Sequence, residues 1–373
     1  MISNAFPLVA LAAMAMAAPA PAPAAHDVQS LPFPLYQLSK RETSYNASLP
    51  NVTIYATGGT IAGSASSNTQ TTGYQAGALG VDVLIDAVPA ITNVSNVKGV
   101  QVSNVDSGSI TAEILLNLTQ QVQAELDSPY CQGVVITHGT DTLEESAFFL
   151  DVTVNTTKPI VFVGAMRPAT AISADGPMNL LEAVTLAGSP SAVGRGAMVV
   201  LNDRIVSAFY ATKTNANALD TFKAVEAGFL GVFIDVAPIF YYPPASPLGK
   251  VVFDVAGATE LPQVDVLYGH QSLNAHLAAA AVESGARGLV LAGMGAGGWT
   301  SGGSDVLDGL VANNGTQIVV SRRTMDGFVE PRDTDGWYGG GFLNPAKARM
   351  LLQLAINAGY KPEQMRSLFE YAA

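Results

Sequence analysis

Short apolar runs that alternate with helix-patterned segments constrain the fold of this chain most. Runs rich in β-branched residues lie at 52–56, 100–105, 133–136, 160–163 and 197–201. Segments with helical periodicity separate several of them, at 111–126, 143–154 and 176–187. Nearly continuous apolarity is typical of parallel strands that are covered on both faces. The βαβα order therefore predicts a larger N-terminal, doubly wound α/β domain with a mainly parallel sheet.

A second, smaller set of elements follows a proline-rich stretch. Prolines cluster between residues 236 and 257, and strand-like runs then appear at 263–267, 288–291 and 317–320. Helical patterns accompany them at 273–283 and 345–358, the latter with Pro345 at a favourable first helical position. We predict an N-terminal catalytic α/β domain at 49–240, a linker at 241–260 and a C-terminal α/β domain with a parallel sheet at 261–373.

Composition limits the class of protein. The chain has 373 residues, of which 49% are hydrophobic and 13% charged, so a large buried core is expected. The formal net charge is -12. Because nucleic acids and anionic membranes attract basic surfaces, we expect neither as a partner.

The N-terminus has the pattern of a secretory leader. Residues 1–18 hold an apolar stretch that ends in small residues, which predicts a signal peptide even though a basic start is missing. Residues 19–48 form a Pro/Ala-rich and then polar segment. Acceptor sequons for N-glycosylation lie at Asn46, Asn51, Asn93, Asn117, Asn155 and Asn314. We expect a secreted glycoprotein, extracellular or in the cell wall, in which the single Cys131 is a small core residue.

Two predicted strands end in turns that carry threonines. The first runs into Thr57-Gly58-Gly59-Thr60 and the second into Thr137-His138-Gly139-Thr140-Asp141. Ligands of open α/β sheets bind outside the carboxyl ends of the strands, so these turns indicate a site. A phosphate-binding P-loop would need a lysine that is absent here, and the glycine spacing does not fit a dinucleotide fingerprint. A plain glycine turn remains the alternative.

A threonine hydroxyl needs an activating neighbour before it can act as a nucleophile. Asp141 and Lys213 can form a relay with Thr140, although a helix cap at Asp141 and a solvated Lys213 are the simpler interpretations. Tyr74 lies in a glycine-flanked segment that can act as a lid carrying a phenol, or it is an ordinary loop tyrosine. We take His138 as structural and predict no metal site, because no histidine and cysteine cluster has ligand spacing.

These residues resemble the two signature motifs of the asparaginase/glutaminase family. Further matching motifs extend the resemblance from Leu49 to the C-terminus: Gly164-Ala165-Met166-Arg167-Pro168, Ser173-Ala174-Asp175-Gly176-Pro177, Thr212-Lys213-Thr214-Asn215 and Leu343-Asn344-Pro345-Ala346-Lys347-Ala348-Arg349. With its leader, the chain is similar to the secreted type II L-asparaginases, and to those of fungi in particular.

The resemblance implies hydrolysis of L-asparagine to L-aspartate and ammonia without cofactor or metal. Thr60 would form an acyl-enzyme with support from Tyr74, and Thr140, Asp141 and Lys213 would make the second catalytic group. The substrate-binding positions that the resemblance implies are Gly59, Ser107, Gly108, Thr140, Asp141 and Ala165. Family members are homotetramers whose sites are shared across dimers, which we expect here too.

Two positions depart from the family pattern. Gly108 stands where many members carry a side chain that bonds the substrate amine, and Gly298 stands where relatives place Asn or Ser from the neighbouring subunit. The neighbour's acidic contact aligns poorly, and Glu330 and Asp333 are alternative candidates for it. These departures leave the first alternative open, a broad glutaminase-asparaginase that also takes L-glutamine. The intact threonine, aspartate and lysine set argues against the second, a non-catalytic amino-acid-binding glycoprotein, and the missing fingerprint argues against the third, a nucleotide-binding reductase of similar topology.

Overall fold

The computed structural model describes residues 45–70 and 77–370. The predicted signal peptide, nearly all of the segment at 19–48 and Tyr74 lie outside these residues. Among the helices that are described, none has the length and apolarity needed to cross a bilayer.

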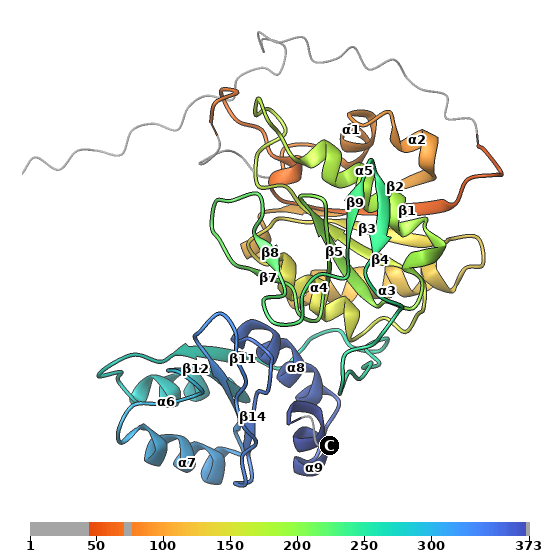
Figure 1. Ribbon diagram of the computed structural model, residues 1–373. Helices are drawn as coiled ribbons and strands as arrows, with labels where there is room; N and C mark the ends of the chain where they lie inside the picture. Colours follow the sequence, from red (N-terminus) through yellow and green to blue (C-terminus); the bar gives the residue numbers. More distant parts are fainter. Residues whose placement is uncertain (1–44, 71–76, 371–373) are drawn as a thin grey trace, which may run out of the picture. The chain divides into compact units, whose positions relative to one another are not determined.

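An eight-stranded mixed sheet forms the centre of the N-terminal domain (Figure 1). Its strand order is β10-β9-β6-β5-β4-β3-β1-β2. Its parallel half consists of β1 (Asn51–Gly58), β2 (Asn96–Val105), β3 (Gly133–Thr137), β4 (Ile160–Val163) and β5 (Ala197–Leu201). Each of these strands overlaps a run predicted from the sequence, and the prediction of a mainly parallel α/β sheet is confirmed. Because all five run the same way, their carboxyl ends meet at one edge.

The sequence analysis did not predict the antiparallel half of the sheet. It comprises β6 (Arg204–Ser207), β9 (Gly231–Ile234) and β10 (Ala237–Phe240), each only four residues long. The turn at Asn202 and Asp203 joins β5 to β6, and both residues have positive φ, as hairpin turns of two residues require. A separate ribbon pairs β7 (Thr212–Lys213) with β8 (Phe222–Lys223).

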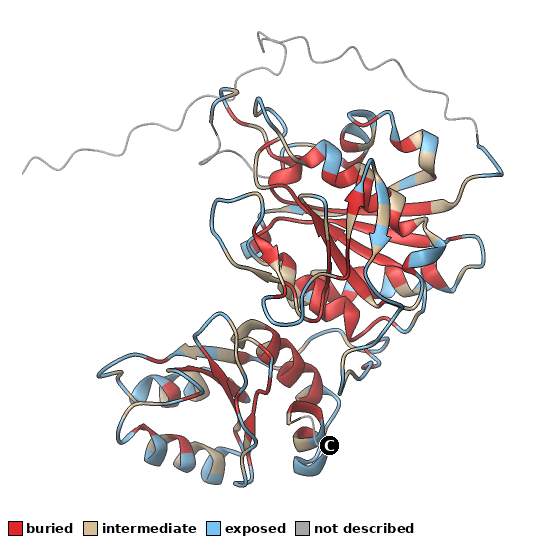
Figure 2. Ribbon diagram, viewed as in Figure 1, coloured by how far each residue is buried: buried red, intermediate tan, exposed pale blue. Residues whose placement is uncertain are grey.

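Helices cover both faces of the large sheet. Those of the N-terminal domain are α1 (Val81–Asp86), α2 (Ile91–Val94), α3 (Ala112–Asp127), α4 (Leu143–Asp151) and α5 (Gly176–Ala187). Val134 and Ile136 of β3 pack with α3 and α4 on one face, while Val135 packs with α5 on the other. Figure 2 shows the resulting buried strands between the helices. This alternation explains why the strand is continuously apolar.

The C-terminal domain contains a smaller, fully parallel sheet, as predicted. Its strands are β11 (Val264–Tyr268), β12 (Gly288–Gly293), β13 (Gln317–Arg322) and β14 (Trp337–Gly339), paired in that order. One face packs against α6 (His276–Glu283) and α7 (Gly303–Asn314). Residues of α8 (Pro345–Asn357) and α9 (Pro362–Phe369) join the other face to the core that also contains α4.

The segment between β10 and β11 is held against the N-terminal domain along its second half. Lys250 Nζ lies 2.7 Å from Asp151 Oδ1 at the end of α4, and the Asp151 side chain is almost fully buried. Phe253 donates its N–H to the Val152 carbonyl and buries its ring. The predicted linker therefore includes a firmly attached part.

A buried carboxyl group gives the fold a pH dependence. Glu182 on α5 is buried, and Asp203 of the β5–β6 turn lies beside it. Burial, and then the nearby Asp203, raise the pKa of Glu182 from 4.5 to about 8. Between these two values the folded protein binds one proton more than the unfolded chain, so the free energy of unfolding falls as the pH rises through this window.

Glu182→Gln should remove this dependence, because glutamine is neutral at every pH. We compare the difference between the thermal midpoints of the variant and the native protein at two pH values. From pH 5 to pH 8 this difference should change by about 2 °C or more in favour of the variant. Differential scanning calorimetry at both pH values measures the midpoints, and Glu283→Gln, at an exposed position, is the control. A difference between Glu182→Gln and the native protein that stays constant with pH would contradict the proton assignment.

Candidate active site

Three strand-end turns touch at the carboxyl edge of the large sheet. A Cβ added to Gly59 would lie 2.2 Å from the backbone nitrogen of Gly139, and one added to Gly139 would lie 2.8 Å from Ser107 Oγ. Gly59 also has a φ of 80°, which glycine adopts at little cost. Glycines at these positions therefore allow the ends of β1, β2 and β3 to come together.

The two predicted threonines lie in these turns. Thr60 begins the 3₁₀ turn η2 (Thr60–Ala62) directly after β1, and its exposed fraction is 8%. Thr140 follows β3 and is 4% exposed. Thr57 Oγ1 donates a 2.9 Å hydrogen bond to the Thr137 carbonyl, which joins the two strand ends. The two strand ends singled out from the sequence are thus joined, and each is followed by a buried threonine.

Lys213 connects the second turn to the ribbon β7–β8. Its Nζ donates to Thr140 Oγ1 at 3.0 Å and to Asp141 Oδ1 at 2.5 Å. The Lys213 side chain is only 15% exposed, whereas that of Asp141 is 70% exposed. The N-cap of α4 is Thr142. The geometry therefore favours the predicted relay over a solvated lysine and a capping aspartate.

Ser107 presents a buried hydroxyl at the end of β2. It begins the 3₁₀ turn η3 (Ser107–Ser109), where its N–H donates to Asp106 Oδ1 and its carbonyl accepts from Thr142 Oγ1 at 2.8 Å. Its Oγ has no hydrogen-bond partner within the described chain. Gly108 lies beside it in open space, since an added Cβ would meet nothing nearer than 3.9 Å. Both residues line a cavity of about 220 Å³, whose other walls come from α3, α4 and α8 and do not include Thr60 or Thr140.

The loop after β4 is fixed by two residues whose role the sequence analysis missed. Asp175 accepts hydrogen bonds from the N–H groups of Met166 and Arg167, both at 2.9 Å, and Asn179 donates to the Gly164 carbonyl at 3.0 Å. Because a trans peptide holds its N–H and C=O on opposite sides, these bonds turn both backbone polar groups of Ala165 away from α5. Asp175 could have been suspected, since it directly precedes α5.

His138 fits the structural role assigned to it. It is completely buried, with Nδ1 2.8 Å from the Gly139 carbonyl and its ring next to Phe162. Burial lowers the pKa of His138 to about 4, so the ring is neutral at physiological pH. Across residues 45–70 and 77–370 we find no group of three or more His, Cys, Asp or Glu that could hold a metal ion.

The remaining predicted positions are placed as follows. Tyr74 lies outside the described residues. Gly77, the first described residue after it, donates its N–H to the Gly59 carbonyl and therefore lies next to the first turn. Gly298, Glu330 and Asp333 are exposed in loops of the C-terminal domain. Gly298 exchanges two backbone hydrogen bonds with Met294.

Comparison with known proteins identifies the family. The model described as "Asparaginase, N-terminal" matches residues 51–246, and the one described as "Glutaminase/Asparaginase C-terminal domain" matches residues 263–369. The chain belongs to the asparaginase family. The two matched regions contain all the site residues described above, and the unmatched residues 247–262 lie in the segment between β10 and β11.

Individual asparaginases are similar over nearly the whole chain. The Schizosaccharomyces pombe protein described as "Probable L-asparaginase 1" is 60% identical over 87% of this chain and 90% of its own. "L-asparaginase 2-3" of Saccharomyces cerevisiae is 50% identical over 89% and 93%. A crystal structure described as a probable cytoplasmic L-asparaginase from Campylobacter jejuni matches with a TM-score of 0.82 and 42% identity, over 86% of this chain and 99% of that one.

Gly59→Ala tests the contact between the turns. The added methyl group would overlap the Gly139 backbone, which cannot move aside as a flexible side chain could. We expect the free energy of unfolding to fall by about 3 kcal/mol, measured by urea titration. Gly257→Ala is the matched control because its Cβ would meet nothing within 4 Å. Equal stability of the two variants would contradict a tight contact.

Proposed function

We propose that this protein is an L-asparaginase, which hydrolyses the side-chain amide of L-asparagine to L-aspartate and ammonia. One observation carries the proposal: Lys213 bonds both Thr140 and Asp141 beside the point where Gly59 touches Gly139. This arrangement puts a second hydroxyl with a charged relay next to the turn of Thr60. Relatives described as L-asparaginases, at 50% and 60% identity, support the same activity.

In the first half of the reaction the Thr60 hydroxyl attacks the amide carbon of the substrate. Its proton passes through the Thr140-Asp141-Lys213 group to the amide nitrogen, the C–N bond breaks and ammonia leaves. The product is an ester between Thr60 and the aspartyl side chain. Tyr74, on the resemblance to the family, supports the nucleophile.

In the second half a water molecule attacks this ester. The water gives one proton back to Thr60 through the same group, and L-aspartate leaves. Backbone groups of Gly59, Thr140 and Ala165 surround the reacting carbonyl, where fixed donors stabilise the developing negative charge. Because Asp175 and Asn179 hold the Ala165 loop, its polar groups need no reorganisation during the reaction.

The α-carboxylate and α-amino groups of the substrate need partners of opposite character. The Ser107 Oγ, which no described residue bonds, suits the carboxylate, and the exposed Asp141 carboxylate suits the ammonium group. The open space at Gly108 leaves one wall of the pocket without a side chain. This observation supports the second candidate, a glutaminase-asparaginase with room for a longer substrate.

Thr60→Ala should abolish ammonia release, because the other hydroxyl of the first turn, that of Thr57, is bonded to the Thr137 carbonyl and none is left to form the ester. We expect kcat on L-asparagine to fall by about 1,000-fold or more while the thermal midpoint stays close to the native value. A coupled ammonia assay with purified mature protein measures the rate. Native turnover by the variant would contradict the assignment of Thr60 as the nucleophile. If the native protein binds aspartate but shows no turnover, an amino-acid-binding protein is favoured.

The preference between L-asparagine and L-glutamine is decided by comparing kcat/KM on both. We expect L-asparagine to be preferred. A Gly108→Gln variant, which places a hydrogen-bonding side chain at the open wall, should alter the ratio rather than both rates equally. Equal rates of the native protein on the two amino acids would establish the broad enzyme instead.

We propose further that the protein is secreted as a type II enzyme and acts outside the cell or in its wall. The apolar leader at 1–18 and the sequons support this. Protein recovered from culture medium should begin after residue 18 and lose mass on deglycosylation. An uncleaved intracellular chain would contradict it.

A homotetramer with sites shared across dimers completes the proposal. It rests on the family resemblance and on the exposed positions of Gly298, Glu330 and Asp333, which a neighbouring subunit could reach. Sedimentation equilibrium should give four times the chain mass, whereas an active monomer would rule out shared sites.

A further inference from the structure

The strand that carries Lys213 has little support from its own sheet. β7 contains only Thr212 and Lys213, and it pairs with the equally short β8. A two-stranded ribbon of this length is not stable by itself. The position of the Lys213 ammonium must therefore be set by contacts outside the ribbon.

A buried lysine of the C-terminal domain makes three of these contacts. Lys347 on α8 is 2% exposed, and its Nζ donates to the carbonyls of Ala208 at 3.0 Å, Phe209 at 2.9 Å and Ala211 at 2.5 Å. An ammonium group has three N–H donors, so all of them are used on the segment that leads into β7. Burial lowers the pKa of Lys347 to about 8, which leaves the group protonated at neutral pH.

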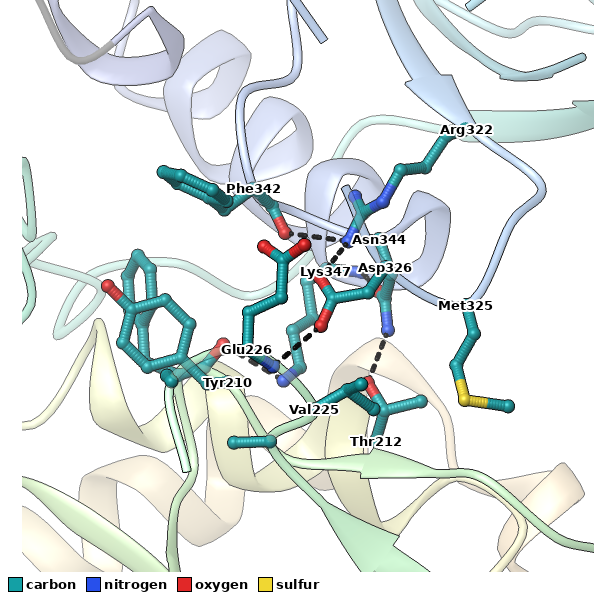
Figure 3. A pocket seen from close by; sticks show the side chains of 13 residues that line it. Tyr210, Thr212, Val225, Glu226, Arg322, Met325, Asp326, Phe342, Asn344 and Lys347 are labelled. Carbon is teal, nitrogen blue, oxygen red and sulfur yellow. Dashed lines mark hydrogen bonds and ion pairs between the residues drawn. The ribbon is translucent and has the colours of Figure 1, made fainter. Parts of the chain in front are cut away.

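Asn344, the N-cap of α8, holds Thr212, which is the residue after Ala211. Asn344 Oδ1 accepts the N–H of Lys347, and Asn344 Nδ2 donates to Thr212 Oγ1 at 3.1 Å (Figure 3). From the other side, Glu144 of α4 accepts the N–H of Lys213 at 3.1 Å. α4 begins just after Thr140 and Asp141. The Glu144 contact therefore positions Lys213 relative to the same helix that directly follows its two side-chain partners.

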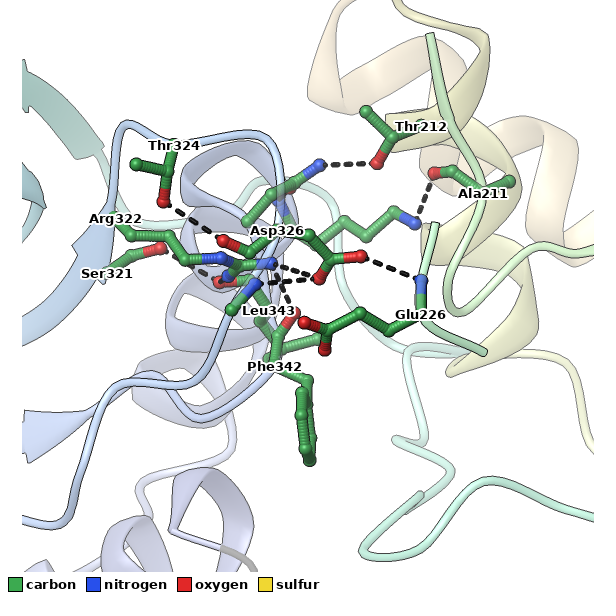
Figure 4. Close-up of polar contacts among 12 residues, drawn as sticks. Ala211, Thr212, Glu226, Ser321, Arg322, Thr324, Asp326, Phe342 and Leu343 are labelled. Carbon is green, nitrogen blue, oxygen red and sulfur yellow. Dashed lines mark hydrogen bonds and ion pairs between the residues drawn. The ribbon is translucent and has the colours of Figure 1, made fainter. Parts of the chain in front are cut away.

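The chain beyond β8 is tied to the C-terminal domain as well. Asp326 accepts the N–H of Glu226 at 2.9 Å and is itself held by Arg322 at 3.1 Å (Figure 4). The chain is thus tied to the C-terminal domain both before β7 and after β8. Asn344 and Lys347 of the first set of contacts and Glu226, Arg322 and Asp326 of the second all line one cavity of about 270 Å³.

We propose that Lys347 is a positioning residue for the reaction, which acts by holding the Lys213 ammonium within reach of Thr140 and Asp141. The inference rests on the proposed function for the role of Lys213. An ammonium group is costly to bury unless every donor is bonded, and here each bond fixes one carbonyl of the approach to β7. An apolar side chain would fill the same space but leave those three carbonyls without donors.

The test is a double-mutant cycle between Lys347→Met and Lys213→Met. We expect Lys347→Met alone to lower kcat on L-asparagine by about 100-fold with KM within about threefold, because small misplacements of a reacting group cost this much. In the Lys213→Met background the same substitution should change kcat by less than about twofold, since its effect passes through Lys213. A merely structural role would lower the amount of folded protein without this coupling.

Lys158→Met is the matched control. Lys158 also donates to backbone carbonyls, those of Leu126 and Ser128, but precedes β4 and so lies at the edge of the sheet opposite the site. It should lower the thermal midpoint and leave kcat unchanged. If Lys347→Met does not fold, Lys347→Gln, which keeps two donors, takes its place in the cycle.

Each outcome decides the inference. Unchanged kcat in the folded Lys347 variant, or an equal loss in both backgrounds, would overturn the positioning role while the proposed function stands. Native kcat in Lys213→Met would instead remove Lys213 from the proposed mechanism, and the inference with it. Loss of kcat that depends on Lys213 supports both.

Discussion

The candidate site depends on a backbone contact that only glycine permits. Gly59 and Gly139 approach so closely that neither could carry a Cβ without displacing the other turn or Ser107. The parallel strands bring their carboxyl ends to one edge, but the spacing of about 4.8 Å between strands leaves little room for side chains between the turns. Once the glycines close that gap, the turns that carry Thr60, Ser107 and Thr140 lie in contact with one another.

Much of this arrangement could be predicted from the sequence. Continuous apolar runs identified the parallel strands, and the turns that follow them identified Thr60, Thr140 and Asp141. The antiparallel half of the sheet was not predicted, because β6, β9 and β10 are too short for periodicity to be informative. One local signal was available, since Asn202-Asp203 is a dipeptide that suits a two-residue hairpin turn.

The supporting residues were harder to predict for a different reason. Lys347 lies within a helical pattern where a charged side chain normally indicates the solvent face, and only the tertiary structure places it against the carbonyls near Ala208. Asp175 reads as a helix cap, yet it bonds the loop after β4. Such roles depend on what lies opposite in space, which spacing along one chain does not reveal.

The attachment of Lys250 to Asp151 has a consequence for a chain that has been cut. The exposed, proline-containing stretch at 241–248 is the natural place for a protease to cleave, and the attachment lies just beyond it. A nick there would separate the covalent halves but leave the second half held by the buried ion pair, by Phe253 and by the packing of α8 on α4. The two fragments would then remain a single folded particle, visible as two bands only after denaturation.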